Sequence, residues 1–333
     1  MTLDPIAFQP YSDPDEFIRD VTDRIWVARD IDHIVENYEE DSIVHGSLGT
    51  TVGRQGVIDG TTMRIAATPQ HVGVAEDVVW EPRGNDAFLS SHLVFSSDEH
   101  IIDGRLRRVR SRTVANCLYR RGRMVEEWVV RDTLADCLQM GIDPEVAAHR
   151  MRFIGHSGSW AGGPPEDPLR RGDSGDRPEN ANASCQTVLD MIEDVWNKRR
   201  LNRVHDYMIR DLFLHTVGDV TVLRPEGYQK DLLALVAPFS ECRFTVRDLQ
   251  ANDNPDYAGL RVAVLWQMTG TYAGLPTFGP LTDAPVDLMG VSQFLIQNGR
   301  IVRETRVYDE IALRAQIAVH QNESSSLIGT NIY

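Results

Sequence analysis

Lysine and cysteine are scarce in this chain, and neither supports the chemistry for which proteins often use it. Two lysines, Lys198 and Lys230, occur among 333 residues, and both lie in polar segments with helical character. A Schiff-base lysine needs a desolvated amine, so this kind of catalysis is not expected. The four cysteines show no CxxC pair and no metal-ligand spacing, which predicts reduced thiols rather than a disulfide framework or a metal site.

Long apolar runs and an excess of positive charge are also missing. No stretch is long enough to span a bilayer, and residues 1–20 lack the basic and apolar regions of an export signal. The formal charge of −15 works against binding to nucleic acid or to an anionic membrane. We therefore expect a cytoplasmic protein with neither of these partners.

What the sequence does contain is one order of elements, repeated. With 42% hydrophobic residues, the chain is long enough for two domains with separate cores. An offset of 170 aligns the copies near their starts, and an offset of 177 aligns their closing hairpins, as loop insertions would give. The matched pairs are Trp26 with Trp196, His45 with His215, Glu127 with Glu304, and Asp132 with Asp309.

This duplication predicts two domains, over residues 15–151 and 184–320. The interval between them, residues 152–183, is rich in Gly, Pro and Asp without apolar periodicity, so we expect a linker. Each domain should contain three helices packed on a strongly curved, mostly antiparallel sheet. The predicted fold class is thus α+β, with two cone-shaped domains packed through their sheets as an intramolecular pseudo-dimer. Further homo-oligomerisation stays open.

Each copy closes with a hairpin that ends on an aspartate. The hairpins cover residues 117–132 and 294–309, and Asn298-Gly299 is a strong turn signal because both turn positions need positive φ. A helix-forming segment follows each aspartate. The carboxylate could therefore be an acid/base group in a cavity or the N-cap of the next helix, and both interpretations stand.

Short glycine-containing motifs mark the sheet-forming part of each copy. The second copy contains Gly270-Thr271-Tyr272-Ala273-Gly274-Leu275-Pro276-Thr277, residues 290–294 and Gly299-Arg300-Ile301-Val302-Arg303-Glu304. The first contains Gly122-Arg123-Met124-Val125-Glu126-Glu127-Trp128 up to Asp132, but lacks a Gly-Thr-x-x-Gly turn within residues 96–108. With the preceding helices, these motifs resemble the SnoaL-like polyketide cyclases of the nuclear transport factor 2-like superfamily, in two tandem copies.

The resemblance implies a small-molecule substrate, no metal or organic cofactor, and a last-strand aspartate as acid/base at Asp132 and Asp309. Strand alternation places Trp128 on the same face as Asp132, where it would desolvate the carboxylate and raise its pKa. In the second copy this aromatic residue is absent and Arg303 is near, which favours an ionised, less basic Asp309. We therefore expect the first domain to be the catalytic one.

Three further polar residues of the first domain are candidates to donate to a developing oxyanion: His45, His92 and Asn116. Each also has a structural interpretation, as a satisfied histidine or a polar residue at the edge of the core. In the second domain, the equivalents of His45 and Asn116 are His215 and Gln293.

Arginine and aromatic residues are the candidates for substrate binding. Arg110 and Arg112 share one strand face, which would attract an anionic substrate if it faced inward or form a solvated, dimer-facing stripe if it faced outward. The aromatic residues expected at the two cavities are Trp26, Trp128, Trp196, Trp266 and Tyr272.

The sequence thus predicts a cofactor-independent enzyme of the cyclase, isomerase or dehydratase kind, with Asp132 as general base. One alternative is a ligand-binding or scaffold protein with a degenerate site. Another is an epoxide hydrolase, for which Asp132 and Arg112 would supply part of an Asp-Arg-Asp set. A closed apolar funnel with Asp132 at its floor would favour catalysis, and a filled funnel would favour a structural role.

Overall fold

The computed structural model describes residues 3–47, 49–152, 179–254 and 257–329. We call residues 3–152 the first half and residues 179–329 the second half. Most of the expected linker, residues 153–178, lies outside the described residues, and its last part is helical because α6 begins at Glu179.

The first half forms one six-stranded sheet in the order β2-β1-β6-β5-β4-β3. The β1–β6 pair is parallel, and the other neighbours are antiparallel. Its main elements are α1 (Pro14–Trp26), α2 (Asp32–Asn37), β1 (Tyr38–Gly46), β2 (Gly49–Val52), α3 (Arg54–Ala67), β3 (Val72–Pro82), β4 (Ala87–Ile102), β5 (Arg105–Arg120), β6 (Arg123–Arg131), α4 (Thr133–Met140) and α5 (Pro144–Arg152).

The second half repeats this arrangement, with strand order β8-β7-β12-β11-β10-β9 and a parallel β7–β12 pair. Its main elements are α6 (Glu179–Met191), η3 (Ile192–Asn197), α7 (Val204–Tyr207), β7 (Met208–Thr216), β8 (Val220–Leu223), α8 (Arg224–Val236), β9 (Ser240–Asn254), β10 (Tyr257–Thr271), β11 (Pro285–Gln297), β12 (Arg300–Tyr308) and α9 (Glu310–Gly329). The predicted α+β class with two similar halves is confirmed.

The closing hairpins have the turns that their sequences predict. Asn298 and Gly299 adopt φ of 51° and 72°, and Arg121 and Gly122 adopt 51° and 74°. Both turns therefore have two successive left-handed residues, the geometry that matches the twist of a two-residue hairpin.

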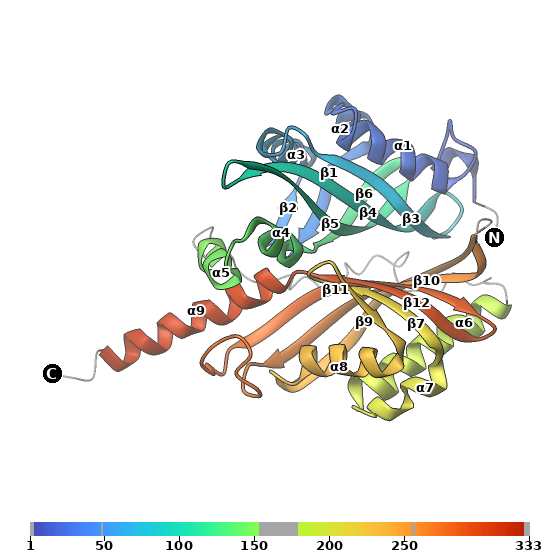
Figure 1. Cartoon of the computed structure of the whole chain (residues 1–333). Helices are drawn as coiled ribbons and strands as arrows, with labels where there is room; N and C mark the ends of the chain where they lie inside the picture. Colours follow the sequence, from blue (N-terminus) through green and yellow to red (C-terminus); the bar gives the residue numbers. More distant parts are fainter. Residues whose placement is uncertain (1–2, 48, 153–178, 255–256, 330–333) are drawn as a thin grey trace.

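The two sheets pack against each other, with α1, α2 and α3 on the outer face of one and α6, α7 and α8 on the outer face of the other (Figure 1). Ion pairs flank the apolar contact, with Arg83 Nη2 2.9 Å from Asp248 Oδ1 and Arg261 bound to Asp77. The shared cluster consists of Leu89, Leu93, Val114, Leu118, Trp128 and Val130 from the first half with Leu265, Met289, Val291 and Val307 from the second. Both faces of each sheet are thus covered.

No helix in the described part of the chain is long and apolar enough to cross a membrane.

Candidate functional site

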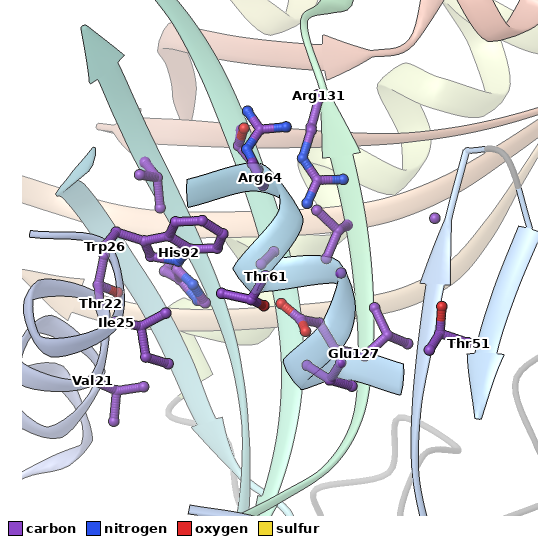
Figure 2. A pocket seen from close by; sticks show the side chains of 18 of the residues that line it. Val21, Thr22, Ile25, Trp26, Thr51, Thr61, Arg64, His92, Glu127 and Arg131 are labelled. Atoms are coloured by element: carbon purple, nitrogen blue, oxygen red, sulfur yellow. The ribbon is translucent and has the colours of Figure 1, made fainter. Parts of the chain in front are cut away.

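The first half contains a cavity of about 360 Å³ between its helices and the concave face of its sheet (Figure 2). One wall is apolar and comes from α1, including Val21, Ile25 and Trp26. The polar and titratable side chains of the lining are Thr22, Tyr38, Thr51, Thr61, Arg64, His71, His92, Ser96, Thr113, Tyr119, Glu127 and Arg131. No group of three His, Cys, Asp or Glu side chains with metal-site spacing occurs among the described residues.

Strand β6 supplies Glu127 and Arg131 to this cavity through its alternation. Glu127, Val129 and Arg131 face the cavity, whereas Trp128 and Val130 pack against the second sheet. The inward face is therefore the opposite of the one that carries Asp132. Trp128 and Asp132 share one face of the strand, as strand alternation predicts, but that face is turned toward the other half of the chain.

Glu127 is the carboxylate of the cavity, and its side chain points into it beside Thr61 (Figure 2). Burial raises the pKa of Glu127 from 4.5 to about 7, although Arg131 and a hydrogen bond from the thiol of Cys117 act in the opposite direction. Cys117 lies directly opposite Glu127 in the β5–β6 ladder. Near neutral pH this group populates both protonation states, which suits a general acid/base.

His92, on β4, also lines the cavity. Burial lowers the pKa of His92 to about 4, so the imidazole is neutral at physiological pH. Its Nδ1 atom is buried and has no hydrogen-bond partner among the described residues. A neutral imidazole can donate one hydrogen bond but cannot act as a cation here.

Asp132 lies elsewhere, at the junction of the two halves. Its carboxylate caps α4 by accepting a hydrogen bond from the Ala135 amide at 3.0 Å. It also accepts hydrogen bonds from the amides of Gly218, at 2.8 Å, and Asp219, at 3.1 Å, in the second half. Asp132 is not among the residues that line the first-half cavity. The structure therefore shows the helix cap that the sequence left open, and not the expected cavity position.

Asp309 occupies the matching position in the second half. Its carboxylate accepts from the Ala312 amide at 3.0 Å and from the Thr133 hydroxyl at 3.0 Å. Burial raises the pKa of Asp309 to about 6. Both hairpin aspartates therefore begin a helix and contact the other half.

The other expected donors of the first half lie on the same outward face. The ring of His45 stacks on Trp128 with centroids 5.4 Å apart, and its Nε2 atom lies 2.6 Å from Glu126 Oε1. Asn116 is opposite Trp128 in the β5–β6 ladder, and its fully buried amide has no hydrogen-bond partner within the described residues. Of the four expected catalytic residues, His92 alone lines the first-half cavity.

The arginine stripe of β5 faces the second half of the chain. Arg110 and Arg112 line a second cavity, of about 480 Å³, that lies between the halves. Arg112 bonds to Glu76 at 2.8 Å and to His215 at 2.8 Å and lies 3.4 Å from Asp219. Arg112 therefore faces the junction of the halves, as in the outward, dimer-facing alternative for the arginine stripe. Because its partners are these groups and Asp132 is bound to amides, an Asp132–Arg112 hydrolytic set is not assembled.

In the second half, side chains fill the space that corresponds to the first cavity. Glu304, the match of Glu127, accepts hydrogen bonds from Ser292 at 2.9 Å and from Arg306 at 2.8 Å. The Arg306 guanidinium is sandwiched between the rings of Trp196 and Tyr228, 4.9 Å from each centroid, and is fully buried. The glutamate here neutralises a buried cation and does not border an open space.

The remaining residues expected at the second cavity are core or interface residues. Trp266 is fully buried against Trp196, and Tyr272 is buried with its hydroxyl donating to the carbonyl of Gly279. The amide of Gln293 donates to the carbonyl of Ser91 at 2.9 Å, across the junction of the halves. The predicted second-half substrate pocket is therefore not formed by these residues.

The strand registers show which second-half residues occupy the positions of cavity-lining residues in the first half. Val94 and Trp266 occupy equivalent positions on β4 and β10, and Val129 and Arg306 occupy equivalent positions on β6 and β12. A small residue lines the cavity in each first-half position, and a large one fills the space in the second. The match of Glu127 with Glu304 in the duplicated sequence was the available signal for the site, although neither residue was predicted as catalytic.

Comparison with known proteins gives a family match for the second half. Residues 186–317 match the family model of the SnoaL-like polyketide cyclases. This half is similar to a SnoaL-like domain. The first half has the same strand order, so the architecture is compatible with two tandem SnoaL-like copies. No protein with a curated description matches the chain.

Several solved structures are similar over the length of one half. A putative SnoaL-like polyketide cyclase from Jannaschia sp. CCS1 is 20% identical, with a TM-score of 0.38, and the match covers 43% of this chain and 96% of that one. A putative polyketide cyclase from Acidithiobacillus ferrooxidans is 19% identical, with a TM-score of 0.36, and the match covers 41% of this chain and 96% of that one. IdmH, a putative polyketide cyclase from Streptomyces antibioticus, is 19% identical, with a TM-score of 0.35, and the match covers 40% of this chain and 98% of that one.

Proposed function

We propose that the protein is a cofactor-independent enzyme of the cyclase, isomerase or dehydratase kind, and that Glu127 is its acid/base. The observation that carries the proposal is a half-buried carboxylate, with a pKa raised to about 7, that faces a cavity of about 360 Å³. The SnoaL-like family resemblance supports a small organic substrate. Because the equivalent space of the second half is filled, we assign that half a supporting role.

The chemistry needs no external oxidant or reductant. The carboxylate of Glu127 removes a proton from carbon next to a carbonyl, and the electron pair moves onto the carbonyl oxygen to give an enolate. The enolate carbon then attacks a second carbonyl, which closes a ring, or takes the proton back at another carbon, which isomerises the substrate. Glu127, now a carboxylic acid, returns the proton. The apolar wall excludes water and strengthens these interactions.

The test uses 2-tetralone, a bicyclic ketone with acidic protons beside its carbonyl. We expect the wild-type protein to accelerate exchange of these protons for deuterium in D₂O, followed by NMR, and Glu127→Gln to lose this acceleration. Glu126→Gln is the matched control, because Glu126 faces away from the cavity and hydrogen-bonds to His45. A folded Glu127→Gln protein that exchanges as fast as wild type would exclude Glu127 as the base.

The alternative is a binding protein without turnover, and the pairing of Glu304 with Ser292 and Arg306 in the second half supports it. The same experiment separates the two functions. Binding of 2-tetralone to the wild type, measured by calorimetry, without accelerated exchange would favour the binding protein.

A further inference from the structure

Two arginines approach each other at one end of the first-half cavity. Arg64 comes from α3 and Arg131 from the end of β6, and both line the cavity (Figure 2). Figure 2 shows their guanidinium groups at the same end of the space, with Glu127 farther along it. The described part of the chain gives neither guanidinium an ion pair or a hydrogen bond. Two like charges thus converge on an open space.

The acidic groups nearest to Arg131 act on its charge, but none forms an ion pair with it among the described residues. Burial, followed by the charge of Arg64, lowers the pKa of Arg131 to about 10, even though Glu127, Asp309 and Asp136 act to raise it. Both side chains are half-buried, so an anion bound between them would offset the repulsion of the two like charges.

The arginines that are buried in the described part of the chain are all paired, whereas Arg64 and Arg131 are half-buried. Arg83 bonds to Asp248, Arg261 to Asp77, and Arg306 to Glu304. The position that corresponds to Arg131 in the filled half is Tyr308, by the register of the equivalent strands. At this strand position, the half with the cavity therefore has Arg131, which forms no ion pair among the described residues, and the other half has a tyrosine.

We propose that Arg64 and Arg131 bind a carboxylate of the substrate, so that the site takes small organic acids with an apolar body. The planar fork of a guanidinium matches the two oxygens of a carboxylate, and two forks from different walls fix its orientation. The apolar body then lies against α1, and a carbon between the two ends reaches Glu127. The assignment of that carbon rests on the proposed function, whereas the anion site does not.

Calorimetric binding of 2-naphthoate and its neutral isostere 2-naphthamide tests this proposal. We expect the wild type to bind the carboxylate at least about tenfold more tightly than the amide, which is about 1.4 kcal/mol. Arg64→Gln and Arg131→Gln should each remove most of this preference. Arg108→Gln is the control, because Arg108 lies on β5 with an exposed side chain paired to Glu99.

Glu127→Gln should keep or increase the preference, since it removes a negative group from the cavity. Equal binding of acid and amide by the wild type, or a preference that survives in both Arg64→Gln and Arg131→Gln, would overturn the proposal.

Thermal unfolding confirms that the variants are folded, and removal of an unpaired charge should not lower their stability. A carboxylate preference without exchange of 2-tetralone would refute the catalytic proposal alone, and exchange without the preference would refute the anion site alone.

Discussion

At the scale of single residues, Glu127 and Glu304 show that neighbours decide what a carboxylate does. Both occupy the same position in equivalent hairpins. Glu304 is held by Ser292 and Arg306 and has no exposed surface, whereas Glu127 faces an open space and has a raised pKa. The same side chain is thus a structural anion in one half and a candidate acid/base in the other.

The raised pKa of Glu127 predicts two opposite pH dependences. Exchange of 2-tetralone should increase as the pH rises through about 7, because the base must be ionised. The folded state favours the protonated form, so its contribution to stability is complete below about pH 4.5 and is lost as the pH rises through about 7. Relative to wild type, Glu127→Gln should therefore be more stable at pH 8 than at pH 5 by urea unfolding. Parallel pH profiles of the two proteins would contradict this.

Glu304→Gln should have the reverse phenotype. It weakens the pairing of Arg306, which is fully buried and keeps Asp231 as its remaining carboxylate partner. Breaking a buried ion pair costs roughly 3 kcal/mol, measurable by urea unfolding. Exchange of 2-tetralone by the folded variant should stay at the wild-type rate, because Glu304 does not line the first-half cavity. Loss of exchange at full stability would contradict the supporting role of the second half.

At the scale of elements, β6 shows what the sequence predicts and where it stops. The hairpin, its turn and the alternation of Trp128 with Asp132 follow from period-2 patterning and turn chemistry. The inward face does not, because both faces of the sheet are covered, one by helices and the other by the second sheet. With both faces buried, polarity no longer marks the cavity side.

The end of β6 gives a prediction about Asp132. Asp132→Ala removes a helix cap and leaves the amides of Gly218 and Asp219 without their acceptor, so it should cost about 3 kcal/mol. Asp132→Asn should cost less, because one amide oxygen still accepts from Ala135 and Gly218. Urea unfolding measures both. If Asp132→Asn abolished exchange without loss of stability, Asp132 and not Glu127 would be the base.

Strand β4 gives a prediction about the cavity. In the second half, Trp266 packs against Gly290 so closely that a Cβ there would lie 2.1 Å from its ring. The double variant Val94→Trp with Thr113→Gly reproduces this pair in the first half and should fill the cavity. We expect it to fold, by circular dichroism, and to lose calorimetric binding of 2-naphthoate. Val94→Trp alone should be destabilised by overpacking against Thr113, by about 1–3 kcal/mol.

At the scale of the whole molecule, the duplication was predictable and the asymmetry was not. Matched residues such as Trp26 with Trp196 imply two similar halves, and the sheets confirm them. Whether the space is open or filled depends on the residue at one position, which is Val94 in the first half and Trp266 in the second. The difference between these two residue numbers is not the same as in the pairs matched from the sequence. Strand register, which the sequence does not supply, was needed to compare them.

The junction between the halves should govern the stability of the whole chain. Asp248→Ala leaves the buried guanidinium of Arg83 with Glu81, at 3.6 Å, as its nearest remaining carboxylate. We expect a loss of about 3 kcal/mol and a single unfolding transition in urea, because the two sheets share one apolar cluster. Circular dichroism and tryptophan fluorescence should give the same midpoint, and two separate transitions would show that the halves unfold independently.

The sheets that cover each other belong to a single polypeptide, so their encounter is first order and does not depend on how concentrated the protein is. Two separate chains joined in the same way would dissociate on dilution and expose the apolar backs of their sheets. Here the covalent tether keeps them together at any dilution, and specific activity should stay constant down to the lowest concentration that an assay can follow.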